Sequence, residues 1–266
     1  MNRLLSNMIG ITCLSLSVVS HAENGLPWSS GFESGNFSDW TGSAYSPLPE
    51  IVDQGCYEGR LCSRSVLQNG TENVSMYVNH HFGDFHNIGL EKVEEVYLKF
   101  HVKIGEGYSW PTGSDTMKVA LINLTDGNTS ARRYQVYIYV DSQGHYVVDH
   151  SYIDSWRFFG LGQNIGQPAS VALGSWDELK LHVRLNDPGS ANGIVRLWVN
   201  GALKVEYTDV NLRENTSYGM GRLILSSQNG GQTGGNGYIY HDAWSLTETD
   251  PDQLSSPPSP PVMNQN

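Results

Sequence analysis

The sequence predicts an all-β protein, a jelly-roll sandwich of two large curved antiparallel sheets. Several stretches alternate apolar and polar residues, as strands with one buried and one solvated face do. Turn signals stand between these stretches, and no segment shows a helical period longer than about two turns. Many antiparallel strands at short spacing, with no internal repeat, favour a sandwich or jelly roll, and the unusual strand length favours large curved sheets.

The N-terminal 22 residues have the features of a secretory signal. They carry one positive charge at Arg3, an apolar middle and the small-residue ending Ser20-His21-Ala22. Cys13 lies within this segment without the usual lipoprotein box, so we expect free secretion to the periplasm or the extracellular space. Removing the signal leaves 266 − 22 = 244 residues, which suits one large all-β domain over 23–254. No second stretch is long or apolar enough to span a bilayer.

The remaining chain is acidic and poor in charged residues. Without Arg3 its formal net charge is −11 − 1 = −12, which argues against bulk attraction to nucleic acid or anionic membranes. Charged residues make up only 16%, whereas glycine and aromatic residues are frequent. This mixture favours strands joined by turns and is typical of extracellular domains that handle sugars.

The mature chain keeps two cysteines, Cys56 and Cys62, at the ends of "CYEGRLC". Thiols oxidise in an exported protein, so we expect a local disulfide. A zinc site is disfavoured because no further Cys or His stands at metal-ligand spacing.

The predicted strands occupy the middle and the end of the chain. Asn200-Gly201, between "LWV" and "ALKV", predicts a tight hairpin. His80 and His81 point to opposite faces of a strand, so we expect one exposed and one packed. From Ser255 onward, proline and serine predict a disordered tail over 255–266. In chain order the clearest strands are 96–104, 133–141, 145–153, 178–186, 194–201 and 237–246.

Three of these strands place reactive or charged side chains on their polar faces. The strand 133–141 presents Arg133, Gln135, Tyr137 and Tyr139 in register. Two others carry basic stripes, which either line a cleft or solvate an outer sheet face. These stripes consist of Tyr97, Lys99, His101 and Lys103 on one strand and Glu178, Lys180, His182 and Arg184 on the other.

Four stretches together resemble a known group of proteins: "GFESGNFSDW", "VYLKFHVKI", "WDELKLHVRLNDPGSANGIVRLWVNG" and "YIYHDAWSL". They are similar to the concanavalin A-like jelly rolls of secreted polysaccharide lyases and glucanases, particularly the glucuronan- and alginate-lyase-like members. The likeness spans most of the mature chain in order. The laminarinase-type glucanases resemble it less, because their Glu-x-Asp-x-x-Glu strand is missing and a retaining glycosidase needs two carboxyl groups about 5 Å apart.

The resemblance implies a lyase that cleaves a uronate-containing polysaccharide by β-elimination. Such an enzyme neutralises the substrate carboxylate, removes the C5 proton and protonates the departing oxygen, which Arg, Gln or Asn together with His and Tyr can do. The candidate catalytic residues are His101, Arg133, Gln135, Tyr137 and Tyr139. The candidate substrate-binding residues are Lys99, Trp110, Tyr152, Trp156, His182 and Arg184.

Two other functions stay open at this stage. The Gln-x-His strand of the alginate-lyase pattern is not recognisable, and a non-catalytic, lectin-like carbohydrate-binding module would keep the same fold and aromatic platforms. A structural or adhesion protein of the cell envelope would keep the fold alone. For the lyase and for the carbohydrate-binding module we expect an anionic polysaccharide as partner. We also expect a monomeric protein.

The resemblance also implies a structural calcium ion. Similar domains bind calcium with a Glu after Phe near the start and an Asp near the end, which here are Glu33 and Asp242. Calcium favours carboxylate and carbonyl oxygens at about 2.3 to 2.6 Å. In the alternative interpretation Asp242 accepts backbone N–H bonds or meets an Arg, and Glu33 caps a turn.

Overall fold

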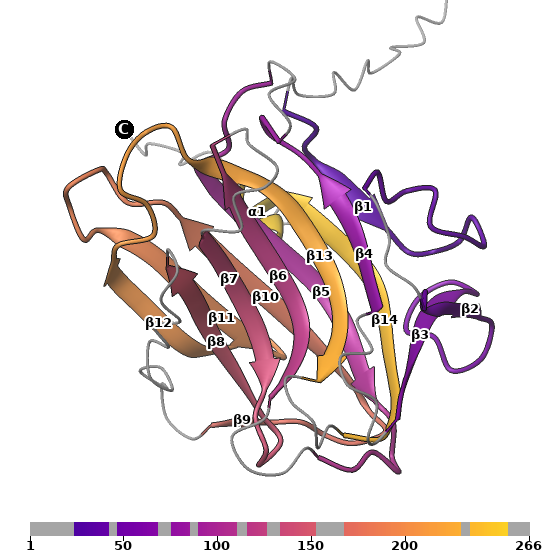
Figure 1. The fold of residues 1–266 in the computed structure, drawn as a ribbon. Helices are drawn as coiled ribbons and strands as arrows, with labels where there is room; N and C mark the ends of the chain where they lie inside the picture. The colour runs from indigo at the N-terminus through magenta and orange to yellow at the C-terminus, as the bar shows by residue number, and fades with distance from the viewer. Residues whose placement is uncertain are drawn as a thin grey trace, which may run out of the picture.

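The computed structural model describes residues 24–42, 47–68, 76–85, 90–110, 116–126, 134–152, 168–229 and 235–254. The expected signal segment 1–22 and the expected tail 255–266 lie outside these ranges. The described residues form two antiparallel β-sheets that pack face to face as two layers (Figure 1). The predicted all-β sandwich is therefore confirmed.

The larger sheet, sheet A, has eight strands and contains the first and the last strand of the described chain. The first strand pairs with the last, as expected for a jelly roll: Ser30 lies opposite Trp244. In spatial order the strands are β12 (Ala202–Val210), β11 (Gly193–Val199), β10 (Trp176–Arg184), β5 (Glu95–Ile104), β14 (Gly237–Thr247), β3 (Cys62–Leu67) and β2 (Glu50–Val52), with β1 (Trp28–Ser30) also on β14.

The smaller sheet, sheet B, has six strands and lies in front of sheet A in Figure 1. The short helix α1 (Pro251–Leu254) follows β14, and no helix of the described residues has the length and apolar character needed to cross a membrane. In spatial order the strands of sheet B are β4 (Met76–His81), β13 (Gly219–Asn229), β6 (Met117–Thr125), β7 (Tyr134–Val140), β8 (His145–Tyr152) and β9 (Ala169–Ser170).

The main hydrophobic core fills the space between the sheets. Alternate residues of β5 point into it, among them Leu98, Phe100 and Val102, and alternate residues of β7, such as Val136 and Ile138, meet them from sheet B. Because successive strand residues point to opposite faces, the residues between these project from the outer faces, away from the core. Each sheet thus presents one outer face.

The predicted strands are found within a few residues of their expected ends, and the predicted hairpin joins β11 to β12. Asn200 and Gly201 have φ of 51° and 76°, as a two-residue turn with left-handed central residues requires.

The alternation expected along the last strand is interrupted by a β-bulge. The register of β14 against β5 shifts between Asp242 and Ser245, and Ala243 has a φ of 48°. One extra residue reverses which side chains face the core. Asp242 therefore lies on the outer face of sheet A, whereas strict alternation along this strand would place it on the same face as Trp244.

Candidate active site

The outer face of sheet B brings three of the predicted catalytic residues together. Gln135, Tyr137 and Tyr139 project from it at alternate positions of β7, as the sequence predicts. The rings of Tyr137 and Tyr139 stack with centroids 5.1 Å apart and planes inclined by 11°. They are 2% and 4% exposed, and they form a second, small cluster with Leu121, Val147 and Ile224.

A bulge in β6 adds a cation to the tyrosine pair. The pairing of β6 with β7 shifts between Lys118 and Ala120, so Lys118 lies opposite Tyr139 while Val119 and Ala120 both face the core. The Lys118 ammonium lies 5.5 Å from the centroid of the Tyr137 ring. A cation in this position stabilises negative charge that develops on the phenol oxygen.

Gln228 of β13 ties this cation to a third tyrosine. Its Oε1 accepts a hydrogen bond from Lys118 Nζ at 3.1 Å and another from the Tyr77 hydroxyl of β4. Lys118 on β6 and Tyr77 on β4 are therefore both hydrogen-bonded to the Gln228 side chain on β13, the strand between them.

Tyr139 is held in its neutral form. Burial, followed by the nearby Tyr137, Asp149 and Tyr77, raises the pKa of Tyr139 well above its ordinary value. A phenol that keeps its proton across the physiological range is suited to donate it to a leaving group.

A row of polar side chains crosses the same face beside the tyrosines. The strand registers place His81 opposite Arg222, Arg222 opposite Asn123, and Asn123 opposite Gln135. In the amide orientation that satisfies both neighbours, the Asn123 oxygen accepts from Arg222 Nε at 3.2 Å. The guanidinium also lies 5.2 Å from the Phe85 ring centroid. Guanidinium and amide donors in one row match the needs of a substrate carboxylate.

The predicted catalytic histidine, His101, lies on the opposite side of the sandwich. His101 projects from the outer face of sheet A, so it is not brought to the face that carries Tyr137. Its ring stacks on Tyr57 with centroids 3.5 Å apart, and its Nε2 lies 3.6 Å from the Glu178 carboxylate. Burial lowers the pKa of His101. The expected grouping of His101 with the residues of β7 is therefore not found.

Three predicted substrate-binding residues share that opposite face, where each has a protein partner. Lys99 pairs with Glu178 at 3.0 Å and with Asp252 at 3.1 Å. His182 Nε2 lies 2.7 Å from Glu95. Arg184 is exposed and donates to the Asn192 carbonyl at 3.3 Å. The residues of both basic stripes alternate along β5 and β10 with residues of the main core, so their side chains point away from sheet B.

The remaining aromatic predictions do not form a platform beside the tyrosines. Trp110 is half-buried against Tyr108, with ring centroids 5.1 Å apart, and packs on the main core. Tyr152 ends β8, and only its backbone pairing with Tyr134 is described. Arg133 and Trp156 lie outside the described residues.

The predicted disulfide is confirmed, and the two predicted calcium ligands hold its loop. Cys56 and Cys62 are bonded, with their Cα atoms 5.4 Å apart. Asp242 Oδ2 accepts the backbone N–H groups of Tyr57 and Glu58, each at 3.0 Å. The sulfur atoms lie within 4.8 Å of the Asp242 carboxylate but, being oxidised, are not thiolate ligands.

Glu33 completes this arrangement from the turn after β1, not from a strand. Its Oε1 accepts the N–H groups of Arg60 and Leu61, both at 2.8 Å, and these bonds lower its pKa. Burial raises the pKa of Asp242, while its backbone hydrogen bonds oppose this and the Glu33 charge adds to it. A hollow of about 570 Å³ borders this region and is lined by Glu33, Glu58, Lys99 and His101 among others.

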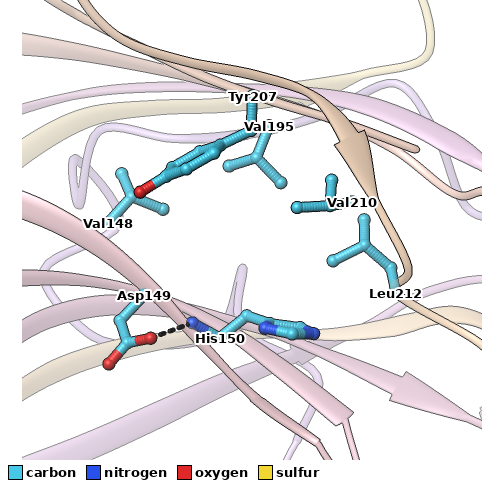
Figure 2. Close-up of a pocket in the computed structure, with 7 residues that line it drawn as sticks. All are labelled: Val148, Asp149, His150, Val195, Tyr207, Val210 and Leu212. Carbon is cyan, nitrogen blue, oxygen red and sulfur yellow. Dashed lines mark hydrogen bonds between the residues drawn. The ribbon is translucent and has the colours of Figure 1, made fainter. Parts of the chain in front are cut away.

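A second hollow, at the edge of the sandwich, carries little chemistry. It lies between β8 and the β12 side of sheet A and is lined largely by Val148, Val195, Tyr207 and other apolar side chains (Figure 2). His150 borders it, and burial lowers the pKa of this histidine to about 4.

Sequence comparison places the polar face of β7 within a family match. The model for polysaccharide lyase 14 matches residues 132–236. This chain resembles the polysaccharide lyases. The matched segment runs from just before β7 to just before β14 and so includes Tyr137, Tyr139, Arg222 and Gln228. No curated protein sequence matches the chain significantly.

Solved structures of lyases share the fold at low sequence identity. An alginate lyase of Aplysia kurodai is 13% identical, with a TM-score of 0.59 over 85% of this chain and 99% of that one. The endo-β-1,4-glucuronan lyase of Trichoderma reesei is 14% identical, with a TM-score of 0.56 over 84% and 95%. The alginate lyase Aly36B, in complex with an alginate trisaccharide, is 14% identical, with a TM-score of 0.56 over 84% and 98%. The expected lyase-type jelly-roll fold is confirmed.

Sequence reasoning missed most of the partners of the tyrosine pair. Lys118 and Gln228 border register shifts in β6 and β13, so simple alternation does not place them on the face of Tyr137. Asn123 sits at an ordinary alternating position and could have been found from "LINL". Arg222 follows a further register shift in β13, although the alternation after it, in "RLIL", could have placed it on the outer face. His80 packs on Trp28 with ring centroids 4.2 Å apart, as one of the two adjacent histidines was expected to do.

Proposed function

We propose that this protein is a secreted, monomeric lyase that cleaves an anionic, uronate-containing polysaccharide by β-elimination. The observation that carries the proposal is the stacked pair of Tyr137 and Tyr139 with the Lys118 ammonium beside it. The pair lies in the segment that matches polysaccharide lyase 14. Alginate and glucuronan, named for the similar structures, are polymers of uronates and set the substrate class.

In the proposed reaction, the polar row binds the uronate carboxylate. Arg222 and the amides of Asn123 and Gln135 supply the donors, and they stabilise the negative charge that spreads onto the carboxylate as the C5 proton leaves. Since these groups sit on three adjacent strands, their positions are fixed before the substrate arrives.

The two tyrosines divide the proton transfers. Tyr137 acts as a phenolate, a form that the Lys118 ammonium stabilises, and becomes a neutral phenol when it takes the C5 proton. The C4–O bond then breaks, a C4=C5 double bond forms, and Tyr139 gives its proton to the departing oxygen. The raised pKa of Tyr139 keeps it protonated for this step. Both rings are nearly fully buried, so substrate access requires a rearrangement over this face.

The test is a panel of polysaccharides: alginate, glucuronan, pectate and glycosaminoglycans. Each elimination creates an unsaturated uronate, so ultraviolet absorbance rises with at least one polymer. A flat trace with every polymer, together with retarded migration in a gel that contains one of them, would assign the protein as a binding module.

A structural calcium ion near Glu33 and Asp242 is a second proposal. The residues present fit it in part: Glu33 and Glu58 line the adjoining hollow, and Glu33 Oε1 alone carries the two N–H bonds. Asp242 fits less well, because its Oδ2 already accepts two N–H groups and its Oδ1 accepts that of Ala243 at 2.8 Å.

Thermal unfolding tests the calcium proposal. An ion that binds only the folded state raises stability by mass action, so millimolar calcium added after chelation should raise the melting temperature of the wild type. Glu33→Gln should remove that rise, whereas Glu206→Gln, on β12, should keep it. An unchanged wild-type melting temperature excludes the ion.

A further inference from the structure

A row of aromatic and cationic side chains crosses the outer face of sheet A, opposite the candidate active site. The registers place Trp176 opposite Lys103, Lys103 opposite Tyr240, and Tyr240 opposite Arg64. The row therefore runs perpendicular to the strands from β10 through β5 and β14 to β3. With strands spaced by about 4.8 Å, four strands span roughly 14 Å, a length that holds several linked pyranose rings.

The side chains of this row contact one another through cation–ring pairs. Lys103 Nζ lies 4.8 Å from the Trp176 ring centroid and 4.4 Å from that of Tyr240. The guanidinium of Arg64 lies 5.0 Å from the ring of Tyr238, the next outward residue on β14. Tyr238 is 45% exposed, and Tyr57, beside the row, is 50% exposed. Exposed aromatic groups arranged in this way are typical of binding surfaces.

Lys103 differs from the other lysines on this face in its partners. Lys99 and Lys180 each pair with carboxylates, Lys180 with Asp250 at 3.0 Å and Asp252 at 2.6 Å. Among the described residues, the polar contact of Lys103 is the Gly55 carbonyl, and no carboxylate lies within ion-pair distance. In a chain with a net charge of −11, a cation left between two aromatic rings is complementary to an external anion.

We propose that this row, Trp176, Lys103, Tyr240, Arg64 and Tyr238, is a second binding surface for an anionic polysaccharide chain. The aromatic rings pack against the apolar faces of the sugars, and Lys103 pairs with a uronate carboxylate. The choice of a uronate polymer rests on the proposed function. The surface lies on sheet A, whereas Tyr137 lies on sheet B. It therefore keeps a long polymer bound to the enzyme without taking part in the elimination.

Part of the row also has a structural contact, which decides the choice of variants. Trp176 Nε1 donates to the Gly55 carbonyl at 3.1 Å, and Lys103 bonds the same oxygen, so both hold the segment before Cys56. Tyr238 makes its ring contacts with Arg64 and Tyr240, and removing its half-exposed ring disturbs the fold least.

Affinity electrophoresis through gels containing alginate or glucuronan tests the proposal. Tyr238→Ala and Lys103→Met should each bind about tenfold more weakly than the wild type, a change of about 1.4 kcal/mol. Lys204→Met, on β12 at the far edge of the same sheet, should migrate as the wild type does. Melting temperatures show whether each variant is folded; if Lys103→Met is not, Lys103→Gln replaces it, because its amide can still donate to the Gly55 carbonyl.

The outcomes separate this inference from the proposed function. If no polymer yields an unsaturated product, yet Tyr238→Ala weakens retardation, the lyase is refuted and the surface stands. If Tyr238→Ala and the folded cation variant migrate as the wild type does, the surface is refuted whatever the lyase assay gives. Equal wild-type retardation by an uncharged polysaccharide also overturns it, because Lys103 would then contribute nothing.

Discussion

Replacing Asp242 with alanine should destabilise the protein by about 3 kcal/mol. Its carboxylate accepts three backbone N–H groups, those of Tyr57, Glu58 and Ala243, at 3.0, 3.0 and 2.8 Å. Hydrogen bonds to a charged group contribute about 1.5 to 3 kcal/mol each, and ordinary ones about 1 kcal/mol. Burial raises the pKa of Asp242 in spite of these bonds, so desolvation of the carboxylate outweighs what they contribute to its charged form. The expected loss therefore comes from the three N–H groups left without an acceptor, at about 1 kcal/mol each.

Thermal unfolding followed by circular dichroism measures this loss. For a domain of this size about 3 kcal/mol corresponds to a fall in melting temperature of roughly 6 to 12 °C. Asp242→Asn keeps one acceptor oxygen and should lose about half as much, and Asp209→Ala, at an exposed position on β12, should melt within about 1 °C of the wild type. An Asp242→Ala protein that melts with the wild type would refute the role of this carboxylate in holding the disulfide loop.

Two further predictions concern the stability of the fold. Removing the disulfide in the double variant Cys56→Ala and Cys62→Ala should lower the free energy of unfolding in urea by only about 2 kcal/mol, because the closed loop is short. Mass analysis of the wild-type mature protein, alkylated without reduction, should show no free thiols. Two alkyl additions would contradict the bond. Acid should also destabilise the protein through His80, His150 and His241, whose pKa values burial lowers to about 4, about 4 and about 3. These folded-state pKa values lie below the unfolded value of about 6.5, so the unfolded chain binds more protons at acid pH. The free energy of unfolding is therefore highest above pH 6.5 and falls as the pH is lowered toward 4, by up to roughly 4 kcal/mol for each pH unit. A free energy of unfolding that stays constant over this range would contradict the neutral burial of these histidines.

Much of the sandwich could be predicted because alternation fixes a strand and its faces. The strands that contain Leu98, Val136 and Leu181 were found for this reason. Alternation cannot say which sheet a strand joins, and so His101 and Tyr137, each correctly assigned to a polar face, were expected side by side although they lie on opposite faces of the molecule.

The rest of the candidate site depends on bulges that the alternation pattern does not reveal. The shift at Lys118 turns a lysine toward Tyr137, and the shift at Ala243 moves Asp242 from the core to the outer face. Each bulge interrupts the hydrogen bonding between two strands and thereby decides on which face of the sheet one polar side chain lies. The two acids predicted as calcium ligands do lie near each other, but the N–H groups they accept come from the disulfide loop, a contact that only the tertiary fold creates.

The initial rate of unsaturated uronate formation by Tyr139→Phe, compared with Tyr97→Phe, tests the central claim most directly. Both changes remove one hydroxyl, the first on the outer face of sheet B and the second on that of sheet A. On the polymer that the wild type cleaves, Tyr139→Phe should be slower by about 10²- to 10⁴-fold, as expected for the loss of a general acid. Tyr97→Phe should retain the wild-type rate. Elimination by Tyr139→Phe at the wild-type rate, or an equal loss in both variants, would contradict the assignment of the active site to sheet B.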